Sequence, residues 1–83
     1  MELKELEEIM EKDVGGNWEG DNAFEGLKIL SKYTYNLIQG ASHATVYSME
    51  AEQALKKGLT KEDAIKLRAY NWMIEDDYFA CFV

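Results

Sequence analysis

The glycines of this chain divide it into short segments, and they constrain its fold more than any other residue type. The sequence has 83 residues, six glycines and no proline. Glycine tolerates a left-handed backbone and commonly ends regular structure. The glycines that interrupt the patterns are Gly15, Gly16, Gly20, Gly40 and Gly58. Because neither a linker nor an internal repeat separates the segments, we expect one domain over residues 1–83.

Two amphipathic helices are predicted before Gly40. Residues 2–12 place apolar side chains on a narrow stripe with glutamates around it. After a glycine-rich loop, Asp21 or Asn22 can cap a second helix, which should run to about Gln39. The polar residues of this second helix fill an arc of only about 80°, so apolar side chains cover most of the remainder. We therefore expect it to be covered on two sides, and we expect the chain to form a homo-oligomer such as a dimer.

Shorter elements are predicted after Gly40. Residues 43–47 are β-branched and aromatic in character, which favours a brief strand. Ser48 can then cap a helix through residue 57, although the pattern leaves open whether residues 43–58 are strand or helix. A capping pattern at Thr60 starts a further helix to about residue 70, with Asn71 as its stop.

The C-terminal segment 72–83 is predicted to form a β-hairpin around the pair Asp76-Asp77. A two-residue turn there sets the cross-strand pairs as Ile74 with Phe79 and Trp72 with Cys81 on one face, and Met73 with Ala80 and Glu75 with Tyr78 on the other. We expect the first face to be buried. The fold class is thus predicted as α+β, with two N-terminal helices packed with a small antiparallel sheet that includes this hairpin. An all-α chain is the alternative.

The charge balance indicates the kind of partner. The chain has 16 Asp and Glu against 9 Lys and Arg, a formal charge of −7. This charge repels duplex nucleic acid and anionic membranes and favours a cationic partner. Glutamates recur along the first helix, where lysines interrupt a row that can face a basic groove. We expect an acidic binding protein, not an enzyme, that docks on a basic protein through Glu2, Glu5, Glu8, Glu11, Glu50 and Glu52, with Trp18, Tyr35 and Tyr47 as aromatic contacts.

The sequence gives less support for a catalytic site, a metal site or a nucleotide-binding site. His43 and Cys81 lack an identifiable third group for catalysis, and they provide no closely spaced ligand pair for a metal. The acidic run before Tyr78 is typical of a solvated turn, and we expect no cofactor. The alternative function is an oligomeric pocket that sequesters a small nucleotide or second messenger, with tyrosines stacking on the base and Lys28 and Lys32 near the phosphate.

Cellular location is predicted from three features. The sequence has no apolar run long enough to span a bilayer, and residues 1–8 lack the character of a signal peptide. A single cysteine cannot form an internal disulfide, which fits a reducing compartment. We therefore expect a cytoplasmic protein without membrane contact.

The C-terminal quarter resembles a known group of proteins. Residues 60–67, then 71–75 and 79–83, resemble the helix-then-hairpin tail of many small bacteriophage and prophage accessory proteins. The resemblance covers about the last 24 residues, and its shared positions are packing and turn positions, so no functional residue is carried across. It implies a protein made in the host cytoplasm that inhibits a host or defence protein, such as a restriction or CRISPR component.

Overall fold

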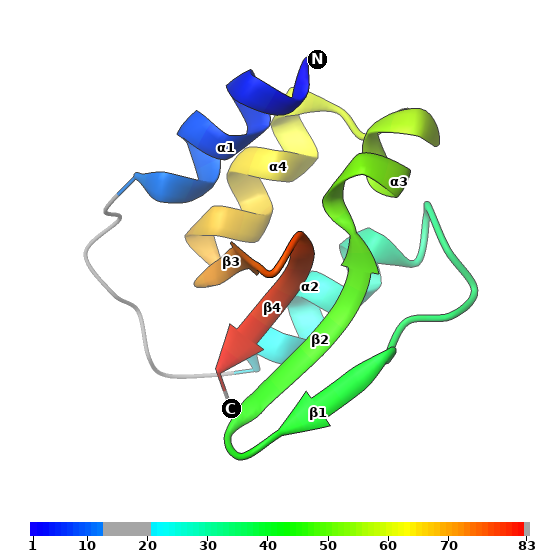
Figure 1. Ribbon diagram of the computed structural model, residues 1–83, viewed down its shortest axis with the longest axis vertical. Helices are drawn as coiled ribbons and strands as arrows, with labels where there is room; N and C mark the ends of the chain where they lie inside the picture. Colours follow the sequence, from blue (N-terminus) through cyan, green and yellow to red (C-terminus); the bar gives the residue numbers. More distant parts are fainter. Residues whose placement is uncertain (13–20, 83) are drawn as a thin grey trace.

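The computed structural model describes residues 1–12 and 21–82. They form helices packed against one antiparallel sheet, which confirms the predicted α+β class (Figure 1). The strand order is β1-β2-β4-β3. In chain order the elements are α1 (Leu3–Glu11), α2 (Asn22–Leu30), β1 (Gly40–Ser42), β2 (Thr45–Glu50), α3 (Ala51–Lys56), α4 (Lys61–Ala69), β3 (Trp72–Glu75) and β4 (Tyr78–Phe82).

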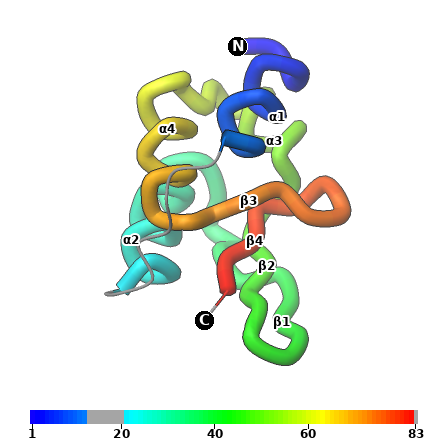
Figure 2. The backbone as a smooth tube through the Cα atoms, turned by 90° about the vertical axis from the view of Figure 1, so that its left-hand side faces the viewer, coloured from blue at the N-terminus to red at the C-terminus, as the bar shows by residue number. Residues whose placement is uncertain are grey.

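The helices and the sheet form two layers. Figure 2 shows α2 and α4 on one side of the strands, and α2 contacts β2, β3 and β4. Helix α1 packs on α4 and against the edge strand β3, while α3 contacts both β2 and α1. The core between the layers contains fully buried side chains from both, the largest being Trp72, Phe79, Leu6, Leu30 and Leu67. Burial of this apolar surface is the main stabilising contribution to the fold.

The C-terminal hairpin has the predicted register, with all four predicted cross-strand pairs present. Asp76 and Asp77 have φ angles of 51° and 72°, as a type I′ turn requires at both of its central positions. Of the face predicted to be buried, Trp72, Phe79 and Cys81 are buried and Ile74 is partly buried, while Ala80 of the other face is buried as well. The turn is also held from outside the hairpin, because the Ala51 N–H donates to the Asp77 carbonyl oxygen at 2.9 Å.

Two predicted helices are confirmed at nearly their predicted bounds. Helix α1 lies within residues 2–12 and buries Leu6, Ile9 and Met10. Helix α4 begins after Thr60, whose hydroxyl oxygen accepts from the Asp63 N–H at 3.1 Å. It ends before Asn71, which has a φ of 64°, as expected for the left-handed residue beyond a helix.

The helix predicted from residue 22 to about 39 is wrong in its second half, because α2 ends at Leu30. Side chains in the next segment bind the backbone in ways that compete with helical hydrogen bonds. The Ser31 hydroxyl donates to the Lys28 carbonyl, and the Thr34 hydroxyl oxygen accepts from the Asn36 N–H at 3.0 Å. The predicted apolar helical surface, which was the basis for expecting a homo-oligomer, is therefore absent. Self-association itself stays a prediction.

Residues 40–50 are also arranged differently from the prediction. Residues 45–47 of the predicted strand 43–47 form the first half of β2, whereas His43 and Ala44 are a turn between β1 and β2. Ser48 lies inside β2 and caps no helix. Pairing of β2 with β4 overrides the helical propensity of residues 48–50. The register shifts between Tyr47 and Glu50, so the chain bulges before α3 begins.

A substitution at Ser48 tests whether this residue lies inside β2 and not at a helix cap. Its side chain is fully buried, and its hydroxyl has no hydrogen-bond partner among the described residues. A buried hydroxyl without a partner costs about 1–3 kcal/mol. We therefore expect Ser48→Ala to leave the free energy of unfolding unchanged or to raise it by up to about 1 kcal/mol in urea titrations. Thr60→Ala is the matched control and should lower it by about 1 kcal/mol, because that hydroxyl caps α4. A loss at Ser48 as large as in the control would contradict the assignment.

Candidate functional site

The glutamates predicted to contact a partner do not form one surface. Glu2 and Glu52 line a shallow pocket between the start of α1 and α3. Glu5 forms an ion pair with Lys61 on α4, with 3.3 Å between the carboxylate oxygen and the ammonium nitrogen. Glu8 is exposed on α1. Glu11 faces a different groove at the C-terminal end of α1, away from the shallow pocket at the start of the helix. The predicted row is therefore divided among separate neighbourhoods.

The remaining predicted site residues lie nearer to the sheet. Glu50 accepts a long hydrogen bond of 3.5 Å from the Tyr78 hydroxyl. Tyr35 is fully exposed and, with Glu50, lines a polar pocket of about 540 Å³. Tyr47 lines the neighbouring pocket beside the hairpin. Trp18 lies outside the described residues.

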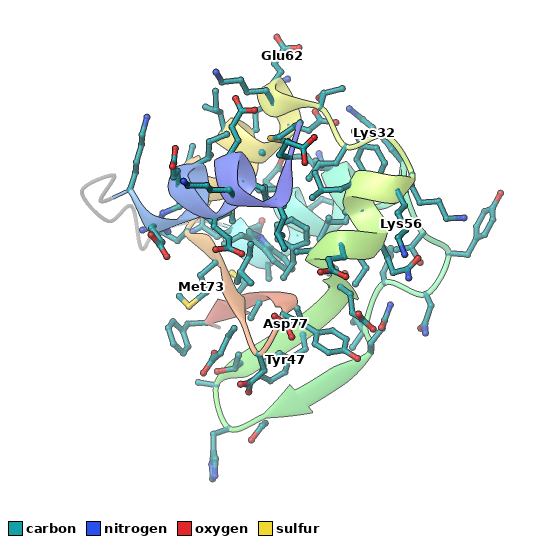
Figure 3. The ribbon with its side chains drawn as sticks, turned by 45° about the horizontal axis from the view of Figure 1, so that its top comes forward. Lys32, Tyr47, Lys56, Glu62, Met73 and Asp77 are labelled. Carbon is teal, nitrogen blue, oxygen red and sulfur yellow. The ribbon has the colours of Figure 1, made fainter. Side chains whose placement is uncertain are left out.

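A groove of about 580 Å³ lies between α1 and the hairpin, and it combines charge with apolar surface. We call it the α1–hairpin groove. Four carboxylates and one guanidinium leave it with a net charge of −3. The lining residues are Glu7, Met10 and Glu11 of α1, Arg68 of α4, and Met73, Ile74, Asp76 and Asp77 of the hairpin. In Figure 3, Met73 and Asp77 mark the hairpin side of this groove.

Local sequence positions the acidic side chains of the groove. Glu7 and Glu11 are four residues apart on α1, so they project from the same side of the helix. Met10 lies between them in sequence and is buried. On the opposite wall, the left-handed backbone of Asp76 and Asp77 makes the tight turn at the hairpin tip. Of these residues, only Glu11 belonged to the predicted contact set.

Arg68 holds the two walls together. Its Nε donates to the carbonyl oxygen of Lys12 at the end of α1, at 2.7 Å. One of its terminal nitrogens donates to the carbonyl oxygen of Trp72 at the start of β3, at 3.2 Å. The guanidinium therefore binds backbone from both walls, and its planar group of donors suits this bridging position. Arg68 therefore links α1 and β3, the two elements that form the walls of the groove.

Asp63 forms a second polar cluster, which joins the end of α2 to the start of α4. Its carboxylate accepts from Lys32 Nζ, at 3.1 and 3.2 Å to its two oxygens, and from the Tyr33 hydroxyl. Burial acts to raise the pKa of Asp63, but the hydrogen bonds from Tyr33 and Lys32 outweigh it, so the pKa is lowered. Burial raises the pKa of Tyr33, and its bond to Asp63 raises it further. This cluster stabilises the fold and withdraws Lys32 from a ligand-binding role.

The other side chains suggested for nucleotide binding are also engaged. Lys28 pairs with Glu25 at 3.3 Å and lies 5.0 Å from the centre of the Phe24 ring. Trp72 is fully buried, and its indole N–H donates to the Asn22 carbonyl oxygen at 2.9 Å. These contacts occupy the two lysines predicted to approach a phosphate, whereas Tyr35 and Tyr47 keep their rings at pocket walls.

Cys81 and His43, the candidates for nucleophilic or metal chemistry, lie in surroundings that do not activate them. Cys81 is buried, and burial raises the pKa of its thiol, which disfavours the reactive thiolate. His43 is exposed in the turn before β2. Among residues 1–12 and 21–82, no group of three or more His, Cys, Asp or Glu side chains is placed to hold a metal ion. Within the same residues, no helix has the length and apolar character needed to cross a membrane.

Comparison of the chain with protein-family models, with curated proteins and with solved structures found no match. The resemblance of the C-terminal tail to phage accessory proteins therefore stays a prediction.

Proposed function

We propose that this chain is an acidic binding protein that docks a basic, partly apolar segment of a partner protein in the α1–hairpin groove. The observation that supports it is one concave surface lined by four carboxylates, from Glu7, Glu11, Asp76 and Asp77, together with apolar side chains and the single cation Arg68. Complementary charge steers association and selects the partner, while apolar contact slows dissociation. The groove offers both.

The apolar side chains distinguish this groove from a solvated acidic surface. Charged side chains on helices commonly face water without any binding role. Here the partly exposed Met73 and Ile74 lie among the carboxylates, while Met10 is nearly buried. Methionine is flexible and polarisable, so it adapts to varied apolar partners. A partner segment with arginine or lysine beside leucine-like residues would complement this lining, whereas a nucleic acid backbone would be repelled by it.

The biological setting is part of the same proposal. The overall charge of −7 and the phage-like tail support an inhibitor that acts in the host cytoplasm on a basic surface of a host or defence protein. Occupation of such a surface by carboxylates would block the nucleic acid or protein that normally binds there. Inhibition then requires no reaction chemistry.

A polar pocket keeps a small nucleotide as the second candidate ligand. Its lining includes Lys57, Tyr35 and Gln53 in a space of about 540 Å³. Lys32, which also lines it, is paired with Asp63, and Glu50 adds a negative charge. A thermal-shift screen separates the two functions, because a nucleotide at 100 times its dissociation constant adds about 2.7 kcal/mol of stability. We rank this candidate second because only one lysine of the pocket lacks a carboxylate partner among the described residues.

Charge reversal in the groove tests the proposed function. The probe is a short synthetic helix-forming peptide with arginines on one face and leucines on the other. We expect Glu7→Lys combined with Glu11→Lys to weaken its binding about tenfold or more, since both attraction and steering are lost. The binding should also weaken as added salt shortens the screening length from about 10 Å at 0.1 M to about 3 Å at 1 M. Nuclear magnetic resonance titration measures the affinity and maps the contact.

The matched control is Glu52→Lys combined with Glu62→Lys, away from the groove. Glu62 lies at the top of Figure 3, far from the hairpin. Each replacement raises the charge by two, so either pair changes the net charge from −7 to −3. Substitutions at exposed positions usually change stability by less than about 0.5 kcal/mol. If both pairs weaken binding equally, the peptide senses only net charge and the groove is not the docking site.

A further inference from the structure

A second pocket adjoins the α1–hairpin groove and shares Asp76 with it. It has a volume of about 410 Å³ and lies between the segment before β1, strand β2 and the hairpin. Two tyrosines, Tyr47 of β2 and Tyr78 of β4, contribute to its lining. In Figure 3, Tyr47 is drawn beside Asp77 at the hairpin tip. We call this the tyrosine pocket.

The tyrosine pocket is negatively charged. Among the described residues that line it, none is basic, and the others besides Asp76 and the tyrosines are Asn36, Gln39 and Gly40. Burial raises the pKa of the Tyr47 hydroxyl, and the nearby negative charges of Glu75 and Asp76 raise it further. The charges of these two carboxylates therefore reach the wall of the pocket. Glu50 adds a third carboxylate through its hydrogen bond with Tyr78.

One of these carboxylates has unused hydrogen-bonding capacity. Glu75 pairs with Tyr78 across the hairpin, so the two side chains project from the same face of the sheet. Oxygen Oε2 of Glu75 is buried and has no hydrogen-bond partner among the described residues. A buried carboxylate oxygen is stabilised by a donor, most strongly by a charged one. Glu75 is not among the lining residues, so its charge acts on the pocket from behind the wall, whereas Asp76 is the carboxylate that lines it.

We propose that the tyrosine pocket binds the guanidinium or ammonium group of an arginine or lysine side chain from the docked partner. This inference rests on the proposed function, because the pocket shares Asp76 with the groove that holds the partner segment. A cation over the face of a tyrosine ring is attracted by the ring's electron density. The Asp76 carboxylate in the lining accepts an N–H group of the cation in a charge-assisted hydrogen bond. An anionic ligand would meet the same carboxylate without a compensating cation.

The test uses a single side chain as the probe. Nuclear magnetic resonance titration compares N-acetylarginine methylamide with N-acetylcitrulline methylamide, which has nearly the same shape and no charge. We expect the arginine compound to shift the resonances of Gln39, Tyr47 and Tyr78, and the citrulline compound to bind at least about fivefold more weakly. Tyr47→Leu should weaken arginine binding by about three- to tenfold. Tyr47→Phe keeps the ring and should stay within about twofold of the unaltered protein.

Two results would overturn the inference. One is equal binding of the arginine and citrulline compounds, and the other is unchanged arginine binding by a folded Tyr47→Leu variant. Circular dichroism establishes that the variant is folded, and Tyr78→Leu provides a second variant if it is not. Either result leaves the proposed function intact if the arginine–leucine peptide still depends on Glu7 and Glu11. If peptide binding does not depend on Glu7 and Glu11 but the arginine compound still binds at Tyr47, the groove is not the docking site. The tyrosine pocket is then still supported as an arginine site.

Discussion

Gly26→Ala is expected to lower the free energy of unfolding by about 3 kcal/mol, although the same exchange in a helix normally stabilises by about 1 kcal/mol. A Cβ atom at Gly26 would lie 1.8 Å from Nε1 and 2.2 Å from Cε2 of the Trp72 indole. Trp72 is fully buried and bonded to the Asn22 carbonyl, so moving the ring would disturb the core and break this hydrogen bond. Small domains have only about 5–15 kcal/mol of stability in total, so such a loss is measurable in urea.

A double-mutant cycle separates the collision from a general intolerance of alanine. Trp72→Phe removes the indole nitrogen nearest to position 26, so Gly26→Ala should cost less in that background than in the unaltered protein. Ala23→Gly, on the same helix, controls for helix propensity and should cost about 1 kcal/mol or less. A stabilising Gly26→Ala would show that α2 and Trp72 do not approach each other as described.

Asp63→Ala is the second substitution with a large expected effect, a loss of about 2 kcal/mol of unfolding free energy. It leaves the part-buried Tyr33 hydroxyl without its carboxylate acceptor and removes the partner of Lys32. The loss is smaller than for a fully buried ion pair because the Lys32 side chain is 58% exposed. Lys32→Ala is the control for the ion pair alone and should cost less than about 1 kcal/mol.

The effect of Asp63 should depend on pH in one direction. Its pKa is lower in the folded chain than the ordinary aspartate value, owing to the hydrogen bonds from Tyr33 and Lys32 that outweigh its burial. The charged form therefore stabilises the fold above the unfolded pKa of about 3.9, and this contribution is lost as the pH falls through the lower, folded pKa. Urea unfolding at a series of pH values should show the free energies of unfolding of the unaltered protein and of Asp63→Ala converging below about pH 4. A difference that widens on acidification would contradict the account.

The parts of the fold that were predictable from sequence depend on local signals. The hairpin register followed from the Asp76-Asp77 turn and the alternation around it, and α4 followed from the cap at Thr60. The end of α2 was missed because the Ser31 and Thr34 side chains bind nearby backbone groups, a possibility that helical periodicity does not reveal. Residues 48–50 of β2 were predicted as helix because the partner strand β4, whose pairing extends β2, lies far along the chain.

The candidate site was less predictable than the fold. Negative charge on α1 was evident, but Glu7 lies beside the hairpin because α1 packs on α4 and β3, an arrangement to which the Arg68 hydrogen bonds contribute. The contact between Gly26 and Trp72 likewise joins residues distant in sequence. Such contacts depend on tertiary packing, which periodicity and capping patterns do not encode. The sequence signal for the α1 side of this groove was a pair of glutamates, Glu7 and Glu11, four positions apart on one helix.

Affinity capture with three matched baits tests the central claim most directly. The baits are the unaltered protein, the Glu7→Lys and Glu11→Lys variant, and the Glu52→Lys and Glu62→Lys control, each applied to host lysate and read by quantitative mass spectrometry. The groove carries four carboxylates beside its apolar lining, so we expect a basic protein that the unaltered and control baits retain and the groove variant loses. Retention of every captured protein by the groove variant, or equal loss from both variants, would contradict docking in the α1–hairpin groove.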